Sequence, residues 1–262
     1  MNIRLDAGRP HLPKLWWLVL LFTVLPVIVN QLPASWFTSV VSSQTACRIT
    51  LHQPIGTIWQ GSAALGFAEP NLVGGGCREA SALTERFHWT TQCSLLKGEC
   101  GLALGFSALD QPLQIRLKLG QAVIASGEIS LPATILEGLG NPWSTLRPRG
   151  QLSARWTELK IGQETGGAIR IMMSSLSSPI SPVKPLGSYE MQVNLAQTGT
   201  VFNLSTTVGP LLLNGKGSVG AGTSSGLHFF GAASASAEAE ESLIGLLSLL
   251  GKKDGDIYRM QY

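Results

Sequence analysis

The sequence contains little charge and few aromatic residues for its length. Only 13% of its 262 residues are Asp, Glu, Lys or Arg, whereas globular domains usually hold about 25%. The formal net charge is +3, and no clustered basic face of the kind that binds nucleic acid is evident. We therefore expect no nucleic-acid partner. Low charge combined with 30 glycines favours short strands and turns over exposed helices, which need solvated charged faces.

Motifs for catalysis or metal binding are equally scarce. The four histidines are scattered, and the four cysteines contain no CxxC pair. Two SxxK matches occur, at Ser94–Lys97 and Ser181–Lys184, but a serine nucleophile of this type needs Ser and Lys on one helix. The second match lies among prolines, which oppose a helix, and the first lies between two cysteines. We predict no catalytic, cofactor-binding or metal-binding residues, and no enzymatic activity.

The segment Gly215–Gly220 (GKGSVG) matches GxGxxG letter for letter. The dinucleotide-binding form of this motif requires a helix directly after the glycines. Here AGTSSGLHFF follows, which predicts a loop and then a strand. We interpret the segment as a glycine-rich hairpin, with Asn214–Gly215 as a turn signal.

A long uncharged stretch near the N-terminus predicts a membrane helix. No Asp, Glu, Lys or Arg occurs between Lys14 and Arg48, and an apolar run occupies Leu15–Val29. As a helix, residues 12–32 would span about 30 Å, the thickness of a bilayer's hydrocarbon core. Pro26 should kink this helix, which membrane helices tolerate.

The flanks of this stretch predict its orientation. Trp16 and Trp17 lie at one end and Trp36 at the other, as aromatic anchors do at membrane interfaces. Basic residues precede the apolar run, and positive residues favour the cytoplasmic side. These residues are Arg4, Arg9 and Lys14. We expect residues 1–11 to form a cytoplasmic tail and residues 33–262 to form an exported domain.

A cleaved signal peptide is the alternative, because it also pairs a basic start with an apolar run. The nearest small-x-small sites, around Val41–Ser43 and Gln44–Ala46, lie well past the run. Cys47 suggests a lipoprotein site, although Gln44 stands where an aliphatic residue is expected. The uncleaved anchor is therefore favoured.

The cysteines indicate an oxidising compartment. Cys47, Cys77, Cys93 and Cys100 all follow the apolar run, and four cysteines allow three pairings. Cys93 and Cys100 bracket a plausible turn at Lys97–Gly98, which favours a hairpin disulfide and leaves Cys47 with Cys77. A metal site is the alternative, although no paired histidine supports it.

Apolar and polar residues alternate with period two beyond residue 100, which predicts half-buried antiparallel strands. The runs are 113–119, 152–156, 169–173, 189–195, 202–208 and 211–213. Residues 132–142 predict a helical turn. Residues 237–250 predict a short amphipathic helix that caps one end of the sheet, or alternatively binds a partner. The expected fold is mainly β: one N-terminal transmembrane helix, then a domain built on a long, twisted or curved antiparallel sheet, with a short C-terminal helix.

Several uncommon strings together resemble the type II secretion system protein N family. In chain order they are GTIWQG at 56–61, LEGLG at 136–140 with PW at 142–143 and LRP at 146–148, SPVKPLGSY at 181–189, GPLLLNG at 209–215 and LLSLLGKK at 246–253. GTIWQG predicts a strand whose glycines let the indole of Trp59 pack. The role of these strings is open between a structural role in the fold and contact with a partner.

The resemblance implies a single-pass inner-membrane protein of a Gram-negative bacterium, with a periplasmic β domain and no enzymatic activity. Its partners would be other inner-membrane and periplasmic subunits of the secretion system. The family is also similar, more loosely, to AsmA-like proteins with long, curved antiparallel sheets and apolar grooves. This kinship implies the alternative function of lipid binding or transfer, with lipid as the partner.

Overall fold

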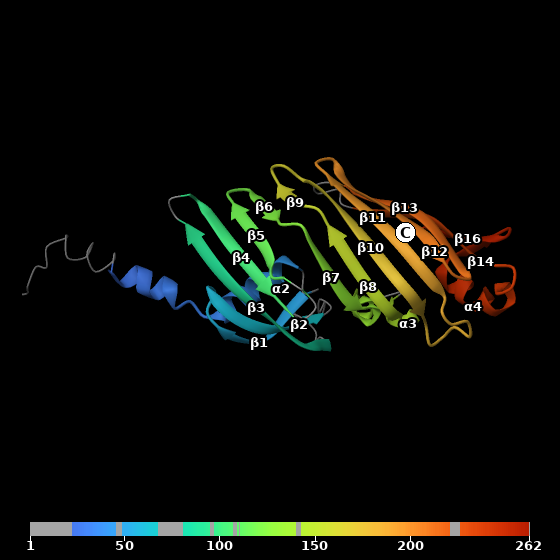
Figure 1. Cartoon of the computed structure of the whole chain (residues 1–262), viewed down its shortest axis with the longest axis horizontal. Helices are drawn as coiled ribbons and strands as arrows, with labels where there is room; N and C mark the ends of the chain where they lie inside the picture. Colours follow the sequence, from blue (N-terminus) through green and yellow to red (C-terminus); the bar gives the residue numbers. More distant parts are fainter. Residues whose placement is uncertain are drawn as a thin grey trace, which may run out of the picture.

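A computed structural model describes residues 23–45, 49–67, 81–94, 97–106, 109, 111–139, 143–220 and 226–261 (Figure 1). These residues form one sheet of 16 antiparallel strands with short helices beside it. The strands are β1 (Ile49–Gly56), β2 (Gln60–Phe67), β3 (Ser81–Ser94), β4 (Glu99–Gly105), β5 (Leu113–Lys118), β6 (Gln121–Ile124), β7 (Gly127–Pro132), β8 (Arg149–Trp156), β9 (Leu159–Gly162), β10 (Gly166–Ser177), β11 (Gly187–Ala196), β12 (Gly199–Val208), β13 (Leu211–Gly220), β14 (Leu227–Ala235), β15 (Lys252–Asp254) and β16 (Ile257–Gln261). The helices are α2 (Ala34–Gln44), the 3-10 helix η1 (Ala133–Leu139), α3 (Trp143–Leu146) and α4 (Glu240–Leu250).

The predicted strands and the C-terminal helix are confirmed. Every alternating run beyond residue 100 falls in a strand, except that Leu119 of the first run lies in the turn after β5 and is exposed. Helix α4 falls within the predicted helix at 237–250. The predicted helical turn at 132–142 contains η1. Leu243, Leu246 and Leu247 of α4 are buried, as expected for an apolar stripe that faces the sheet.

Most strands pair with their neighbours along the chain, but the order changes in the middle of the sheet. Strand β10 pairs with β9 at one end, through Gly166 and Lys160, and with β8 along the rest of its length. Strand β6 pairs with β9, and β7 pairs with β8. Strands β6 and β7 follow each other in the chain and together pair with the consecutive strands β8 and β9. The resulting ladder is interrupted after Ile124 on one side and after Trp156 on the other.

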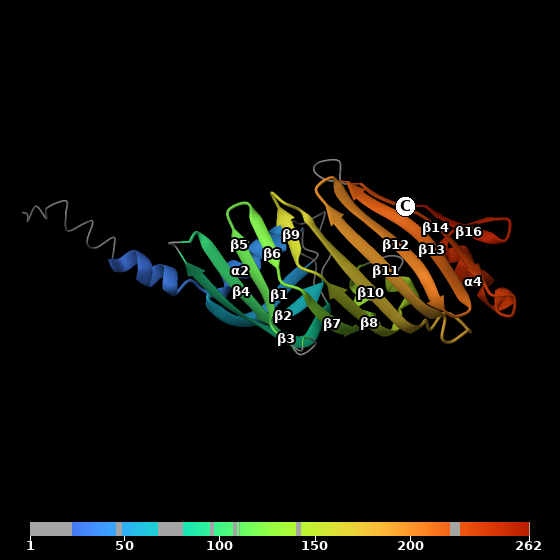
Figure 2. The ribbon, with the colours of Figure 1, turned by 45° about the horizontal axis from the view of Figure 1, so that its top comes forward.

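This interruption divides the sheet into two lobes (Figures 1 and 2). The N-terminal lobe comprises β1–β6, β9 and α2, and the C-terminal lobe comprises the remaining strands and helices. At the break the indole N–H of Trp156 donates a hydrogen bond to the carbonyl of Ala125 at 2.8 Å. The ring lies over Gly127, its register partner, where a Cβ would come within 2.7 Å of the indole. Gly127 thus leaves room for the indole that donates this hydrogen bond at the break.

Each lobe has its own core. In the N-terminal lobe Trp89 is 1% exposed and packs with its ring centroid 5.5 Å from those of Phe37 and Phe87. The core of the C-terminal lobe is larger and lies between the sheet and α4, with Leu243 and Leu247 among its fully buried side chains. Aromatic packing therefore attaches α2 to the sheet, and leucine packing attaches α4.

Two sequence interpretations of glycines are wrong. Asn214 and Gly215 lie inside β13 rather than at a turn. The GxGxxG segment occupies the second half of that strand, and the strand predicted after it is confirmed as β14, which pairs with β13. GTIWQG forms the turn between β1 and β2, and Gly61 makes room for Trp89 rather than for Trp59. In both cases the glycine accommodates an aromatic ring from another strand, which local sequence does not reveal.

Only part of the predicted membrane helix can be described. Residues 12–22 lie outside the described residues, whereas residues 23–30 are helical with every side chain exposed. Within the described part of the chain, no helix is long and apolar enough to cross a membrane.

We expect Leu243→Ala to lower the free energy of unfolding by about 3 kcal/mol, because it removes a fully buried side chain and leaves a cavity under α4. Ile244→Ala is the matched control, since Ile244 is 48% exposed on the same helix, and we expect a change below about 0.5 kcal/mol. Urea denaturation of the full chain, followed by circular dichroism, measures both. Equal midpoints for the two variants would contradict the core position of Leu243.

We expect Trp156→Phe to lower the free energy of unfolding by about 1 kcal/mol or more, because the Ala125 carbonyl loses its indole donor. Arg155→Gln, which changes an exposed neighbour on the same strand, should have a smaller effect. Thermal unfolding of the full chain separates the two variants. A larger loss of stability from Arg155→Gln would contradict the view that the Trp156 hydrogen bond stabilises the break.

Candidate functional site

The C-terminal lobe contains an apolar cavity of about 450 Å³. Its floor is the inner face of β10–β13, one wall comes from α4 and another from α3. Leu246 and Leu250 contribute from α4, and Trp143 and Leu146 contribute from α3. In both views of the ribbon α4 lies beside β14 and β16 (Figures 1 and 2), whereas α3 lies near β8 in Figure 1, at the opposite side of the lobe. The cavity therefore lies between two groups of helices that cover the ends of this sheet.

Period-two alternation explains the floor of the cavity. Met191 of β11 pairs with Leu204 of β12, so their side chains share one face, and Met173 pairs with Tyr189 on that face. Leu213 of β13 lines the same cavity. The residues between these positions, such as Gln192, point to the solvated face. The alternation that predicted the strands therefore also places the apolar residues on the cavity floor.

Two stacked phenyl rings form part of the lining. The rings of Phe202 and Phe229 lie 5.9 Å apart between centroids, with an interplanar angle of 4°. They lie over Gly217 and Gly215 of the strand between them, where a Cβ would overlap the rings. The glycines of the GxGxxG segment therefore provide space for the aromatic lining of the cavity.

Two hydroxyl groups in the lining donate hydrogen bonds to carbonyls of the protein. The hydroxyl of Tyr189 donates to the carbonyl of Leu211 at 3.1 Å, and burial raises the pKa of this phenol. The hydroxyl of Ser178 donates to the carbonyl of Leu146. Among the described residues that line the cavity there is no Asp, Glu, His, Lys, Arg or Cys. The arrangement suits the binding of apolar groups, not proton transfer.

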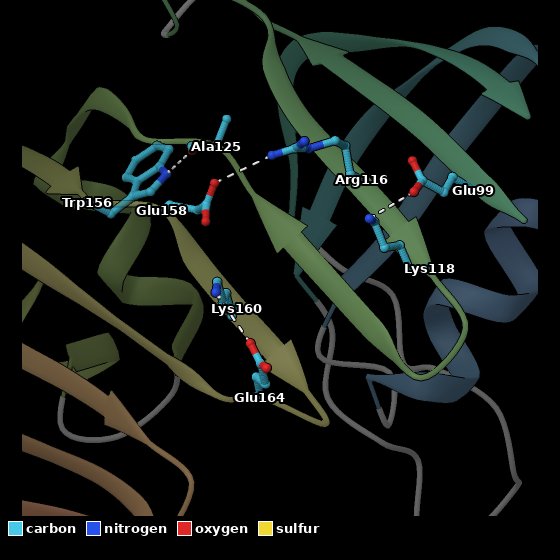
Figure 3. A network of polar contacts seen from close by, with 8 residues as sticks. All are labelled: Glu99, Arg116, Lys118, Ala125, Trp156, Glu158, Lys160 and Glu164. Carbon is cyan, nitrogen blue, oxygen red and sulfur yellow. Dashed lines mark hydrogen bonds and ion pairs between the residues drawn. The ribbon is translucent and has the colours of Figure 1, made fainter. Parts of the chain in front are cut away.

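A second feature is a row of ion pairs on exposed strands beside the break (Figure 3). Arg116 of β5 contacts Glu158 at 3.4 Å, and Lys118 contacts Glu99 of β4 at 2.8 Å. Lys118 holds the pKa of the Glu99 carboxyl below its usual range. Exposed pairs of this kind contribute little to stability. Their charges are matched, so the row is a solvated face rather than a ligand site.

The predicted hairpin disulfide is present. Cys93 and Cys100 are register partners in β3 and β4 and are joined by a disulfide, with Lys97 and Gly98 in the turn between them. Gly98 has a positive φ of 61°, as such a turn requires. Cys47 and Cys77, the other predicted pair, lie outside the described residues.

The SxxK matches do not form helical nucleophile motifs in the described chain. Ser181 is 3% exposed, and its hydroxyl donates to the carbonyl of Val183 within a turn. Ser94 is the last residue of β3 and is exposed. Among the histidines, His52 contacts the Thr50 hydroxyl at 3.0 Å. No group of three or more His, Cys, Asp or Glu able to hold a metal occurs in the described segments.

The residue pattern did not locate the cavity, although the looser kinship with AsmA-like proteins implies an apolar groove. The floor is visible in the sequence only as large apolar residues at alternate positions in the consecutive strands β10–β13. The available signal was the glycine pair in β13 together with Phe202 and Phe229 in the flanking strands, because glycines in a strand often mark a close approach by another group.

Comparison with known protein families gives a match over most of the chain. The sequence model of the family described as type II secretion system protein N matches residues 48–260. No curated protein and no solved structure matches the chain. The matched range includes every described strand except the final residue of β16. The chain therefore belongs to the type II secretion system protein N family.

Proposed function

We propose that this chain is a non-enzymatic structural or accessory component of the type II secretion system in the inner membrane of a Gram-negative bacterium. Residues 12–32 anchor it, and residues 33–262 lie in the periplasm. The match over residues 48–260 carries this proposal, because membership of the family implies a role in type II secretion and contact with other components of that system.

The character of the C-terminal lobe supports a non-enzymatic role. Its cavity offers apolar walls, and the phenol of Tyr189 is engaged by a carbonyl and has a raised pKa. A general base must lose its proton near the working pH, which this phenol does not do. The charged groups near the break are paired with one another on exposed strands. These features serve structure and binding.

The N-terminal region supports the anchor. Helical residues 23–30 carry apolar side chains that the rest of the described chain leaves exposed. These side chains are Val24, Leu25, Val27, Ile28 and Val29. A fully exposed apolar helix is favourable where its surroundings are also apolar. The indole N–H of Trp59 donates to the Val29 carbonyl at 2.8 Å, which ties the end of this helix to the turn between β1 and β2.

The disulfide supports export. The hairpin of Cys93 and Cys100 is exposed at its tip, and such bonds persist in oxidising compartments such as the bacterial periplasm. The cytoplasm would reduce it. The periplasmic position of the β domain is therefore consistent with both the membrane helix and the cysteines.

Deletion of the gene tests the role in secretion. We expect exoproteins of the type II pathway to accumulate in the periplasm, or to leave it more slowly if the subunit is accessory, and expression of the full chain should restore export. A periplasmic protein that is not exported serves as the control for lysis. We also expect the gene to lie among genes of secretion components. Unchanged export together with an unrelated gene neighbourhood would refute the proposal.

The mass of the mature chain tests the anchor separately. We expect the protein to be recovered from the inner membrane with residues 12–32 intact, and to require detergent for its extraction. Intact mass spectrometry locates its N-terminus. A mature chain that begins beyond Ser35 would show that the segment is a cleaved signal peptide.

A further inference from the structure

We propose that the C-terminal end of the sheet binds an acidic segment of a partner protein. The site is a polar hollow of about 630 Å³ between the end of α4 and the strands β15 and β16. It is distinct from the apolar cavity, because Leu250 alone of the described residues lines both. This inference goes beyond the role in secretion proposed above and does not depend on it, because it rests on the charges of the hollow.

The lining of this hollow carries more positive than negative charge. It comes from the last turn of α4, from the three residues of β15, and from Arg259 and Gln261 of β16. Lys252, Lys253 and Arg259 are cationic, whereas Asp254 is the one carboxylate among the described lining residues. Arg259 and Asp254 form an ion pair. Because both lysines are exposed and have no ion-pair partner within the described chain, the hollow is positively charged.

Two of these cations lie directly opposite each other. Lys252 and Arg259 are register partners in β15 and β16, so their side chains share one face of the sheet. Like charges at directly opposed positions destabilise a pair of strands. Asp254 offsets only part of this repulsion, because it pairs with Arg259 and leaves Lys252 unpaired. A carboxylate of a partner that bound beside Lys252 would offset the rest.

Several cations elsewhere on the sheet are paired with carboxylates instead. Lys118 lies 2.8 Å from Glu99, and Lys160 lies 3.4 Å from Glu164. The C-terminus of a helix carries a partial negative charge of about half a unit, which favours cations nearby. The two unpaired lysines that follow α4 exceed this partial charge. Attraction to the helix end therefore does not cancel the positive charge of the hollow.

The shape and position of the hollow favour a protein segment over a membrane surface. The site is concave, whereas a bilayer presents a flat surface to a protein of this size. Figures 1 and 2 show α4 and β16 at one end of the elongated chain and the helical residues 23–30 at the other. The proposed membrane anchor is therefore remote from the hollow. Leu249 lines the hollow and is 59% exposed, so an acidic segment that also carries a large apolar side chain matches both the charge and the apolar rim.

Isothermal titration calorimetry of the full chain in detergent tests the proposal with two short synthetic peptides. One peptide is rich in Asp and Glu and contains one Leu, and the other replaces each acid by the corresponding amide. We expect the acidic peptide to bind at least about tenfold more tightly than the amide peptide. Raising the NaCl concentration from about 0.1 M to about 1 M should weaken its binding, because salt screens exposed charges.

Two double variants provide the matched comparison. Lys252→Gln with Lys253→Gln removes the unpaired charges of the hollow and should weaken binding of the acidic peptide by about tenfold. Lys118→Gln with Lys160→Gln changes the net charge of the chain by the same amount, but at lysines that are paired with carboxylates outside the hollow. This second variant should leave binding unchanged. Circular dichroism checks that both variants fold.

Three results would overturn the proposal. The first is the absence of measurable binding at peptide concentrations up to about 1 mM, or equal binding of the two peptides. The second is equal weakening by the two double variants, which would indicate unspecific attraction to a positively charged protein. The third is displacement of the acidic peptide by soluble dihexanoyl phosphatidylglycerol at lower concentrations than the peptide itself needs, which would assign the hollow to lipid headgroups. None of these results bears on whether deletion of the gene blocks export, so the two proposals can fail separately.

Discussion

Strand β10 is the element on which the continuity of the sheet depends. It pairs with β9 of the N-terminal lobe through Gly166, with β8 through Ile169–Ser177, and with β11 along its other edge. Strand β10 therefore changes its partner from β9 to β8 along one edge, while its other edge pairs with β11 throughout. Because β8 and β9 follow each other in the chain, the change of direction is confined to a few residues after Trp156. Two separate cores can form on either side of this joint without interrupting the hydrogen-bonded sheet.

The strands could be predicted from the sequence because their signal is local, whereas the cavity depends on register between strands. Alternation at 113–119 and 189–195 is visible in a short window, and so is the leucine stripe of α4. The turn predicted at Asn214–Gly215 follows the same local logic and fails, because a ring from the neighbouring strand needs the space above Gly215. Likewise, Met191 and Leu204 become neighbours only through pairing of their strands.

Both ends of the sheet discourage the addition of further strands. Strand β1 carries a register irregularity between His52 and Ile55, and Pro54 within it has no N–H to donate. Strand β15 has only three residues, Lys252–Asp254, all of them exposed and charged. Edges of this kind resist pairing with another chain. Partner subunits of the secretion system are therefore expected to contact faces, helices or loops of this domain rather than extend its sheet.

The low charge of the chain follows from this architecture. A sheet whose outer face is solvated by matched ion pairs, such as Arg170 with Glu190 at 3.2 Å, needs few charges to remain soluble. On the inner face, α4 shares one core with buried residues of β10, β11 and β13, among them Met173, Tyr189 and Leu211. Gly215 and Gly217 leave space that the rings of Phe229 and Phe202 fill. The cavity of about 450 Å³ lies beside these rings, and apolar walls of this kind suit the binding of an apolar group.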